Sequence, residues 1–189
     1  MTKQLSIGAV ILVFVAVGAW WQWGRQAATE PYTFPVASED VIASWNYAGA
    51  YSGNAELEAK GKANIQRLSE LFGKEGDTFT DYELYVSVAN EYDLLGDGKG
   101  TYDYLLKALT IDAEKTGLAW HNMGVLMAKL GALNSARIAY DRMVKAQPHI
   151  INYHSARIEF LKTYMPEDTA AIAAAEDARA QITGEYIFE

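Results

Sequence analysis

The sequence contains no cysteine and only four prolines among its 189 residues. The absence of cysteine excludes disulfides, thiolate zinc sites, cysteine-ligated iron–sulfur clusters and thiol catalysis. Basic residues are also scarce: 16 Lys and Arg stand against 24 Asp and Glu, and the formal charge is −8. Because affinity for a nucleic-acid backbone comes mainly from cations, we expect no nucleic-acid partner.

No charged residue occurs between Lys3 and Arg25. This segment contains an apolar run over residues 7–19, which is followed by Trp20, Trp21 and Trp23. As a helix it would be roughly 30 Å long, the thickness of a hydrocarbon core, with the tryptophans at the headgroups. We therefore predict a transmembrane anchor over residues 1–24, in contact with the membrane through residues 5–24. A signal peptide cleaved after Ala19 and a buried core helix are the alternatives.

The few charges beside this segment bear on its orientation. Lys3 and the terminal amine stand against Arg25 alone, so the positive-inside rule favours a cytoplasmic amino terminus. The carboxyl-terminal domain is then expected outside the cytoplasm, in a periplasmic or extracellular space. The stem of a bacterial type IV pilin is a further interpretation, with a leader that ends at Gly8. Pilins usually carry a glutamate five residues into the mature helix, and this chain has Val13 there.

The residues after the anchor divide into a linker and a helical domain. Pro31 and Pro35 favour extended backbone, which predicts a linker over residues 25–38. Ser38, followed by two acidic residues, predicts the start of a helix. From there to Thr183 the periodicity is helical, with breaks at Gly53, Gly73 and Gly76, Gly96–Gly100, Gly131 and Pro166. The fold class is therefore expected to be all-α, with six to eight helices of about 10–16 residues.

One segment follows a repeat pattern without a gap. Its signature positions are Trp120, Gly124, Ala136, Tyr140 and Pro148, with Met123 and Met127 at two further apolar positions. This segment resembles a tetratricopeptide repeat, in which W-x2-L-G-x2-Y is followed by A-x3-F and then by P. Independently of the family, the two small residues would let paired helices approach closely, and the large side chains would fill the space between repeats.

Neighbouring segments resemble the repeat less well. Tyr85, Val88, Ala89 and Tyr92 fill the first-helix positions before it, and residues 150–182 form a degenerate copy after it. The resemblance implies antiparallel helical hairpins, stacked as a short solenoid over residues 81–183. Residues 39–80 are expected to be helical, as a possible degenerate repeat, and residues 184–189 to form a tail. A generic helical bundle is the alternative.

The resemblance also implies a binding face, because the first helices of such repeats line a concave groove that holds peptide segments. Here these positions are Glu83, Val86, Asn90, Asp93, Leu118, His121, Asn122, Val125 and Lys129. Asn90 and Asn122 match two asparagines of repeats that clamp a terminal carboxylate. Val86 stands where such a clamp has a lysine, and Glu83 and Asp93 would repel a carboxylate. A mixed apolar and acidic groove is therefore expected.

Residues suited to catalysis, metal binding or cofactor binding are not evident. The histidines His121, His149 and His154 do not have the spacing of a metal site on one helix face. Residues 93–101 partly resemble a calcium-binding loop, but Leu95 replaces one ligand and Tyr104 replaces the closing glutamate. We expect no enzymatic activity and no cofactor.

Two functional hypotheses follow. The first is a non-enzymatic adaptor, tethered to a membrane, that binds a protein or peptide segment and assists assembly or transport there. Its architecture is similar to that of ancillary repeat proteins of the Sec translocon. The second is a structural accessory subunit of a larger membrane complex or filament, assembled through small residues of the anchor (Gly8, Ala9, Ala16, Gly18 and Ala19). The tail, Glu185–Glu189, would pack on the last helix or serve as a short ligand for a partner.

Overall fold

The computed structural model describes residues 32–74 and 79–184. The predicted anchor, the first part of the predicted linker and residues 185–189 of the predicted tail lie outside the described residues. Regular structure in the described ranges is helical throughout, and the only strand-like pairing there is one isolated bridge between Asn46 and Asp97. No helix in these ranges is both long and apolar enough to cross a membrane.

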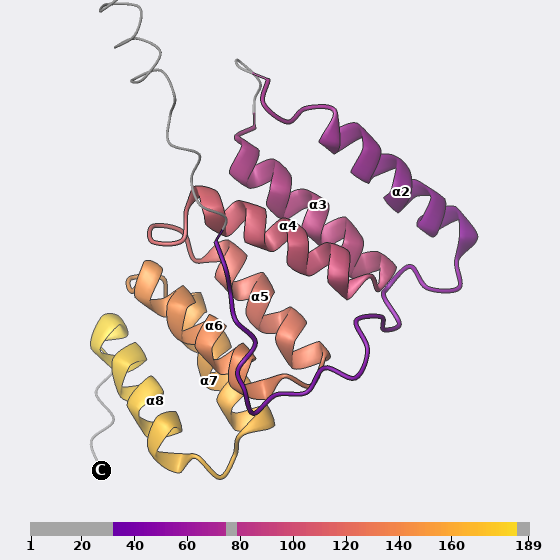
Figure 1. Cartoon of the computed structure of the whole chain (residues 1–189). Coiled ribbons are helices and arrows are strands. Elements are labelled where there is room, and N and C mark those ends of the chain that lie inside the picture. Colours follow the sequence, from indigo (N-terminus) through magenta and orange to yellow (C-terminus); the bar gives the residue numbers. More distant parts are fainter. Residues whose placement is uncertain (1–31, 75–78, 185–189) are drawn as a thin grey trace, which may run out of the picture. The chain divides into compact units, whose positions relative to one another are not determined.

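Seven helices follow one another in the described residues (Figure 1): α2 (Ala55–Ser69), α3 (Asp81–Leu95), α4 (Gly98–Ile111), α5 (Leu118–Lys129), α6 (Leu133–Ala146), α7 (Ile151–Tyr164) and α8 (Thr169–Thr183). Helices adjacent in sequence pack against each other, most extensively α3 with α4 and α5 with α6. The connections α3–α4, α5–α6 and α7–α8 lie on one side in Figure 1, and α4–α5 and α6–α7 lie on the opposite side. The all-helical prediction and the breaks at Gly96, Gly131 and Pro166 are confirmed.

Local capping interactions determine where α3 and α4 begin. Thr80 and Glu83 form a capping box, in which the Glu83 carboxylate accepts a hydrogen bond from the Thr80 amide at 2.8 Å. The Asp97 carboxylate accepts a hydrogen bond from the Gly100 amide at 2.8 Å and caps α4. The backbone hydrogen bond from Thr80 also lowers the pKa of Glu83. Glu83, a predicted groove residue, and Asp97, within the segment 93–101 that resembles a calcium-binding loop, thus cap helices.

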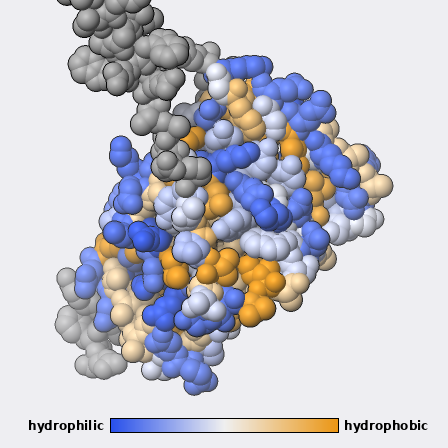
Figure 2. Space-filling model, viewed as in Figure 1, coloured by the Kyte–Doolittle hydropathy of each residue, from blue (hydrophilic) through white to orange (hydrophobic). Residues whose placement is uncertain are grey.

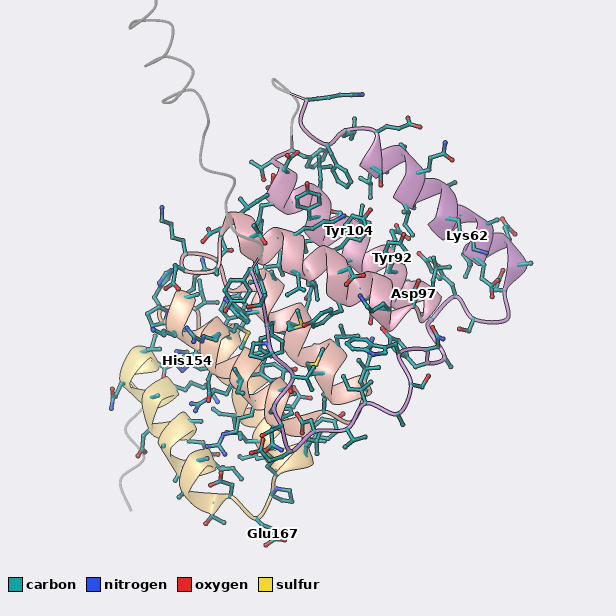
Figure 3. The ribbon with its side chains drawn as sticks, in the orientation of Figure 1. Lys62, Tyr92, Asp97, Tyr104, His154 and Glu167 are labelled. Atoms are coloured by element: carbon teal, nitrogen blue, oxygen red, sulfur yellow. The ribbon has the colours of Figure 1, made fainter. Side chains whose placement is uncertain are left out.

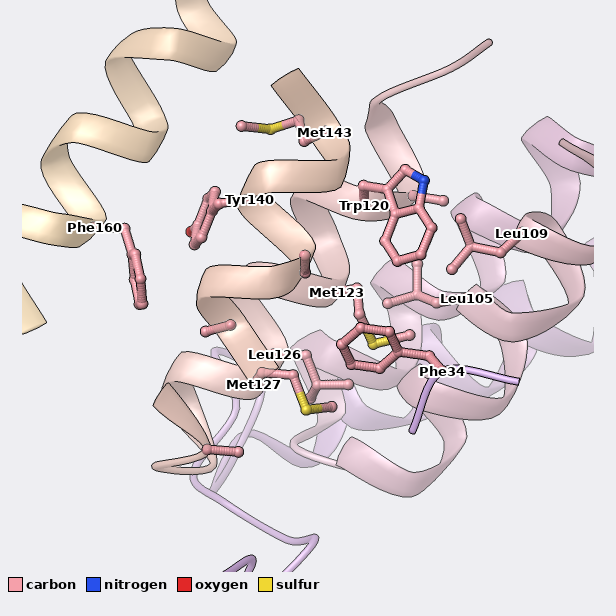
Figure 4. Close-up of a cluster of buried hydrophobic side chains, with 14 of the residues drawn as sticks. Phe34, Leu105, Leu109, Trp120, Met123, Leu126, Met127, Tyr140, Met143 and Phe160 are labelled. Carbon is pink, nitrogen blue, oxygen red and sulfur yellow. The ribbon is translucent and has the colours of Figure 1, made fainter. Parts of the chain in front are cut away.

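The core lies between the α3–α4 and α5–α6 hairpins and continues to α7 and α8 (Figure 4). Trp120 is 1% exposed, and Met123, Met127 and Ala136 are fully buried. Gly124 lies directly against the Tyr140 ring: a Cβ added at Gly124 would be 2.9 Å from the ring edge. A larger residue at this position would therefore push α5 away from α6. The burial expected from the repeat pattern is confirmed at these positions.

The N-terminal strap, residues 32–54, differs from the prediction. The sequence predicts a linker to residue 38 and a helix from residue 39, but residues 32–54 as described contain no helix, and the first helix of the described ranges begins at Ala55. The strap instead runs across the face shown in Figure 2, where apolar side chains gather close to its course among mostly hydrophilic ones. Phe34 is 3% exposed and its ring contacts Trp120 edge-on, with centroids 5.8 Å apart. The strap is therefore part of the packed domain.

Backbone and side-chain hydrogen bonds hold the strap to distant helices. The Tyr32 amide donates to Thr110 Oγ1 at 2.8 Å, and Tyr102 Oη donates to the Phe34 carbonyl at 2.6 Å. At its other end the Gly98 amide, in the first turn of α4, donates to the Trp45 carbonyl at 2.8 Å. These contacts join residues more than fifty positions apart, which a local sequence pattern does not encode.

Asp40 explains why the predicted helix start fails. Its carboxylate accepts hydrogen bonds from the amides of Asn134 (3.2 Å) and Ser135 (2.7 Å) and from the Ser135 hydroxyl (2.6 Å). The residue at the N-cap of α6 is Ala132, which has no side chain able to cap the helix. Asp40 therefore caps α6 from a distant part of the chain, close to the positive end of the helix dipole.

We expect Asp40→Ala to lower the free energy of unfolding by about 1–2 kcal/mol at neutral pH, because the α6 amides lose their cap. Burial raises the pKa of Asp40, but the hydrogen bonds from Ser135 and Asn134 outweigh this and leave it below the ordinary value of 3.8. Stabilisation by a group with a depressed pKa is complete above its unfolded-state pKa and is lost as pH falls through its folded-state pKa. Urea unfolding at decreasing pH, followed by circular dichroism, measures both effects.

Two variants serve as controls for the Asp40 cap. Val41 is the exposed neighbour of Asp40, at 83%, so Val41→Ala should change the free energy of unfolding little. Asp40→Asn keeps one acceptor oxygen but carries no charge. Its free energy of unfolding should therefore not show the part of the low-pH decrease that comes from protonation of Asp40. A difference between wild type and Asp40→Ala that stays constant below pH 3.8 would contradict the capping role of the carboxylate.

Candidate functional site

Contacts between α3 and α5 bring four of the predicted groove residues into one row. Asn122 Nδ2 donates a hydrogen bond to Asn90 Oδ1 at 2.8 Å. Further along both helices, Lys129 Nζ lies 2.7 Å from each carboxylate oxygen of Asp93. The two pairs join residues 32 and 36 positions apart, on either side of the 34-residue repeat length, because α3 and α5 lie side by side and side chains of neighbouring turns meet between them.

The strap adds a residue to this row. Tyr47 Oη donates a hydrogen bond to Asp93 Oδ1, and the Lys129 ammonium lies 5.3 Å from the centroid of the Tyr47 ring. Burial, together with the nearby Asp93 carboxylate, raises the pKa of Tyr47, so its hydroxyl remains protonated and continues to donate. Lys129 is thus neutralised by Asp93 and is not available as the cation of a carboxylate clamp.

Three predicted groove positions do not contribute to this row. Val86 is 3% exposed and belongs to the core, so its assignment to the groove was wrong. The reason is that α2, α4 and α5 all pack against α3 and cover most of its circumference. Glu83 is exposed but caps α3, and Leu118 is exposed at the first residue of α5, one turn before Asn122, and takes no part in the hydrogen bonds between side chains of the row.

A recess of about 340 Å³ lies between α5 and α7. Its lining includes the predicted groove residues His121, Val125 and Lys129, together with residues of α6 and α7: Tyr140, Ala156, Glu159, Phe160, Thr163 and Tyr164. Tyr140 and Phe160 stack with ring centroids 4.8 Å apart, and Figure 4 shows their rings facing each other between the helices. Tyr164 continues the aromatic surface, 5.5 Å from Phe160, and is 47% exposed.

Sequence reasoning missed the α7 side of this recess, although a signal for it was present. Moving the predicted positions Asn122, Val125 and Lys129 forward by one 34-residue period gives positions 156, 159 and 163. All three line the recess, as Ala156, Glu159 and Thr163. In this degenerate third copy, Arg157 stands where the repeat pattern has glycine, so the pattern marks the groove positions of α7 only weakly.

The recess offers aromatic faces, the phenols of Tyr140 and Tyr164, and the carboxylate of Glu159. Burial raises the pKa of Tyr140 to about 12, with further contributions from Tyr164 and Glu159, so the phenol is protonated at neutral pH. Glu159 is exposed at the rim, whereas the only lysine of the lining, Lys129, is paired with Asp93. Such a surface suits a large apolar side chain of a ligand and disfavours an acidic one.

Two of the three histidines, His121 and His154, have structural contacts, and His149 is exposed. His154 is 4% exposed, and its Nε2 donates to the Pro148 carbonyl at 2.8 Å across the α6–α7 connection. His121 Nδ1 lies 3.2 Å from Asn122 Oδ1, and its ring packs between Tyr140 and Tyr153. In the described ranges, no three His, Asp or Glu side chains lie together in a way that would hold a metal ion.

Another hollow, of about 600 Å³, lies along α4. Tyr92 and Tyr104 stack there with centroids 5.5 Å apart, and Figure 3 shows them near Asp97 at the junction of α3 and α4. The Lys107 ammonium lies 4.0 Å from the Tyr104 centroid, and Lys99 pairs with Asp103. The α5–α7 recess is the better candidate for ligand binding because it contains the predicted groove residues His121, Val125 and Lys129, whereas no predicted groove residue lines the hollow along α4.

No family model, no curated protein and no solved structure matches this chain.

Proposed function

We propose that this protein is a non-enzymatic adaptor that binds an extended segment of another polypeptide on the face formed by α3, α5 and α7. In this proposal, the hairpins α3–α4, α5–α6 and α7–α8 form a short solenoid of the tetratricopeptide type. The buried repeat-signature residues Trp120, Gly124, Ala136 and Tyr140 support that interpretation. A transmembrane anchor over residues 1–24, with the repeats outside the cytoplasm, is also part of the proposal and is supported by the sequence pattern alone.

The observation that carries the proposal is that the aromatic recess lies directly beside the asparagine pair. An extended peptide exposes backbone amide and carbonyl groups that need partners, and an asparagine side chain can donate and accept at once. Asn90 and Asn122 are bonded to each other at the surface, and exchange of this bond for bonds to a peptide costs little. His121 borders both features, because it contacts Asn122 and lines the recess.

Charges around the recess indicate the chemistry of the ligand. Lys129 is compensated by Asp93, while Glu159 at the rim has no positive partner in the lining of the recess. The ligand segment should therefore carry an aromatic or large aliphatic residue for the recess, and neutral or basic residues beside it.

This proposal predicts that a purified full-length chain in phosphatidylcholine nanodiscs selects apolar, non-acidic peptides from a random peptide library. Tyr164→Ala should weaken binding of a selected peptide about 30-fold, as is typical of an aromatic hot spot. Asn122→Ala should weaken it by up to about tenfold through the loss of hydrogen bonds. Fluorescence anisotropy of the labelled peptide measures both effects.

Ile138→Ala is the matched control, because Ile138 is also exposed, at 41%, but lies on α6 outside the recess. It should leave affinity unchanged. Selected peptides whose binding is the same for wild type, Tyr164→Ala and Asn122→Ala would contradict the proposed site. A stoichiometric crosslink from Ala16 of the predicted anchor to another membrane protein, with no peptide binding, would instead favour the accessory-subunit hypothesis.

A further inference from the structure

Exposed apolar side chains gather at one end of the helix stack. This end consists of the first residues of α3, α5 and α7 and the last residues of α4 and α8. The large apolar residues exposed there are Phe79 (55%), Ile111 (51%), Leu118 (44%), Ile151 (42%) and Ile182 (38%). Each lies at or beside the end of a different helix, and these helix ends lie on the same side as the α4–α5 and α6–α7 connections in Figure 1. We call this set the apolar end.

The strap begins at the apolar end. The Tyr32 amide is bonded to Thr110 Oγ1, in the last turn of α4, and the Tyr32 ring packs edge-on against Trp120 at 5.5 Å. Both contacts fix the first described residue beside the α4–α5 connection. The residues that precede Tyr32 therefore join the domain at this end and not at the opposite one.

Chain length then limits how far this end can lie from the predicted anchor. Only the residues from Arg25 to Pro31 separate Gly24 from Tyr32. A fully extended chain of that length spans at most about 25 Å. The opposite end, where α3 joins α4 and α5 joins α6, is further away by the length of a helix, about 20 Å. The apolar end is thus the part of the domain nearest to the point at which the chain enters from the predicted anchor, and contact there needs the least extension of residues 25–31.

We propose that the apolar end rests on the surface of the lipid bilayer and inserts these side chains among the headgroups. This inference depends on the membrane anchor of the proposed function. The charged residues nearby, Asp112, Glu114 and Lys115 between α4 and α5, are mixed in sign, so burial of apolar area drives the contact and anionic lipid is not required. The helices then stand upright on the membrane, and the α5–α7 recess opens sideways along the bilayer surface.

Because the chain has no cysteine, one introduced cysteine can be labelled uniquely. The full-length protein is reconstituted in phosphatidylcholine vesicles with a fluorophore at Leu118→Cys or Ile151→Cys. Matched controls at the opposite end are Ser52→Cys, just before α2, and Glu167→Cys, between α7 and α8, both of which are exposed. Quenching by a lipid with a spin label near its headgroup should be severalfold stronger at the apolar end than at the controls.

Equal and weak quenching at all four positions, in protein that floats with the vesicles, would overturn the inference while leaving the anchor intact. Protein that does not float with the vesicles would instead refute the anchor, and the proposed function with it. The double variant L118E/I151E, which alters two exposed positions, should fold normally by circular dichroism and float normally. In that variant, quenching at a Phe79→Cys label should fall severalfold, and unchanged quenching there would also contradict the proposal.

Discussion

Trp120→Ala is expected to lower the free energy of unfolding by about 3–5 kcal/mol, enough to unfold a large share of molecules of an ordinary small domain. Trp120 is 1% exposed and lies where α4, α5 and the strap meet. Its ring contacts Tyr32 and Phe34 edge-on, and its Nε1 donates to the Ala113 carbonyl at 2.8 Å. The truncation leaves a large cavity and removes the surface on which the start of the strap packs. Urea unfolding of the full-length chain in detergent, followed by helical circular dichroism, gives the change.

Trp120→Phe separates packing from hydrogen bonding. Phenylalanine retains most of the apolar volume but leaves the Ala113 carbonyl without its donor, so a smaller loss of about 1–2 kcal/mol is expected. Proteolysis provides a second readout, because cleavage within residues 32–38 should become faster in Trp120→Ala than in Trp120→Phe if the strap depends on this ring. A loss below about 1 kcal/mol for Trp120→Ala would contradict the central position of Trp120 in the core.

The helices could be predicted from the sequence because the signals that determine them are local. Glycine and proline mark the breaks at Gly96, Gly131 and Pro166, and helical periodicity fills the intervals between them. The repeat signature also predicted which large side chains of α5 and α6 would be buried, since Gly124 and Tyr140 must meet for the hairpin to close. Such signals lie within a few turns of the residues they affect.

The strap could not be predicted because its partners are remote. Ser38, Glu39 and Asp40 form a good local pattern for a helix start, and local reasoning has no basis for rejecting it. The Asp40 carboxylate instead accepts hydrogen bonds from two amides in the first turn of α6, which have no partner within that helix. This interaction forms only when the fold brings the two segments together. A helix whose own N-cap residue is alanine is the one hint in the sequence that a cap comes from elsewhere.

The candidate site was predicted in part. The repeat resemblance predicted Asn90, Asp93, Asn122 and Lys129 for one face, and the structure joins them there in two pairs. The sequence did not show these pairs, nor that Asp93 would neutralise the lysine. Val86 was misplaced because it joins the core that α3 forms with α4 and α5, and the repeat pattern alone did not show which side of α3 faces that core. The recess between α5 and α7 combines residues of three helices, so only the assembled fold defines its shape.

The second large effect is expected at Gly96, where the α3–α4 connection touches the strap. Gly96 has φ +79°, and a Cβ added there would lie 2.0 Å from the Tyr47 carbonyl oxygen. Gly96→Ala therefore combines left-handed backbone strain with a collision between main chains, and it disrupts the hydrogen bond from the Tyr47 amide to the Gly96 carbonyl. We expect it to lower the free energy of unfolding by about 3 kcal/mol or more.

Two other glycines separate these causes. Gly131 has φ +76° but open space around the position of a Cβ, so Gly131→Ala should show strain alone, about 1–2 kcal/mol. Gly49, in the strap, has no left-handed backbone, yet an added Cβ would lie 2.3 Å from the Leu94 carbonyl oxygen. Gly49→Ala should therefore show the collision without the strain. The contradicting outcome has two parts: Gly96→Ala lowers the free energy of unfolding no more than Gly131→Ala does, and Gly49→Ala leaves it unchanged. The strap would then not pack against the α3–α4 connection. In that case α3 would have room for a ligand where Tyr47 now covers Asp93, and the groove would extend further toward α2 than the contacts of Lys129 and Tyr47 allow.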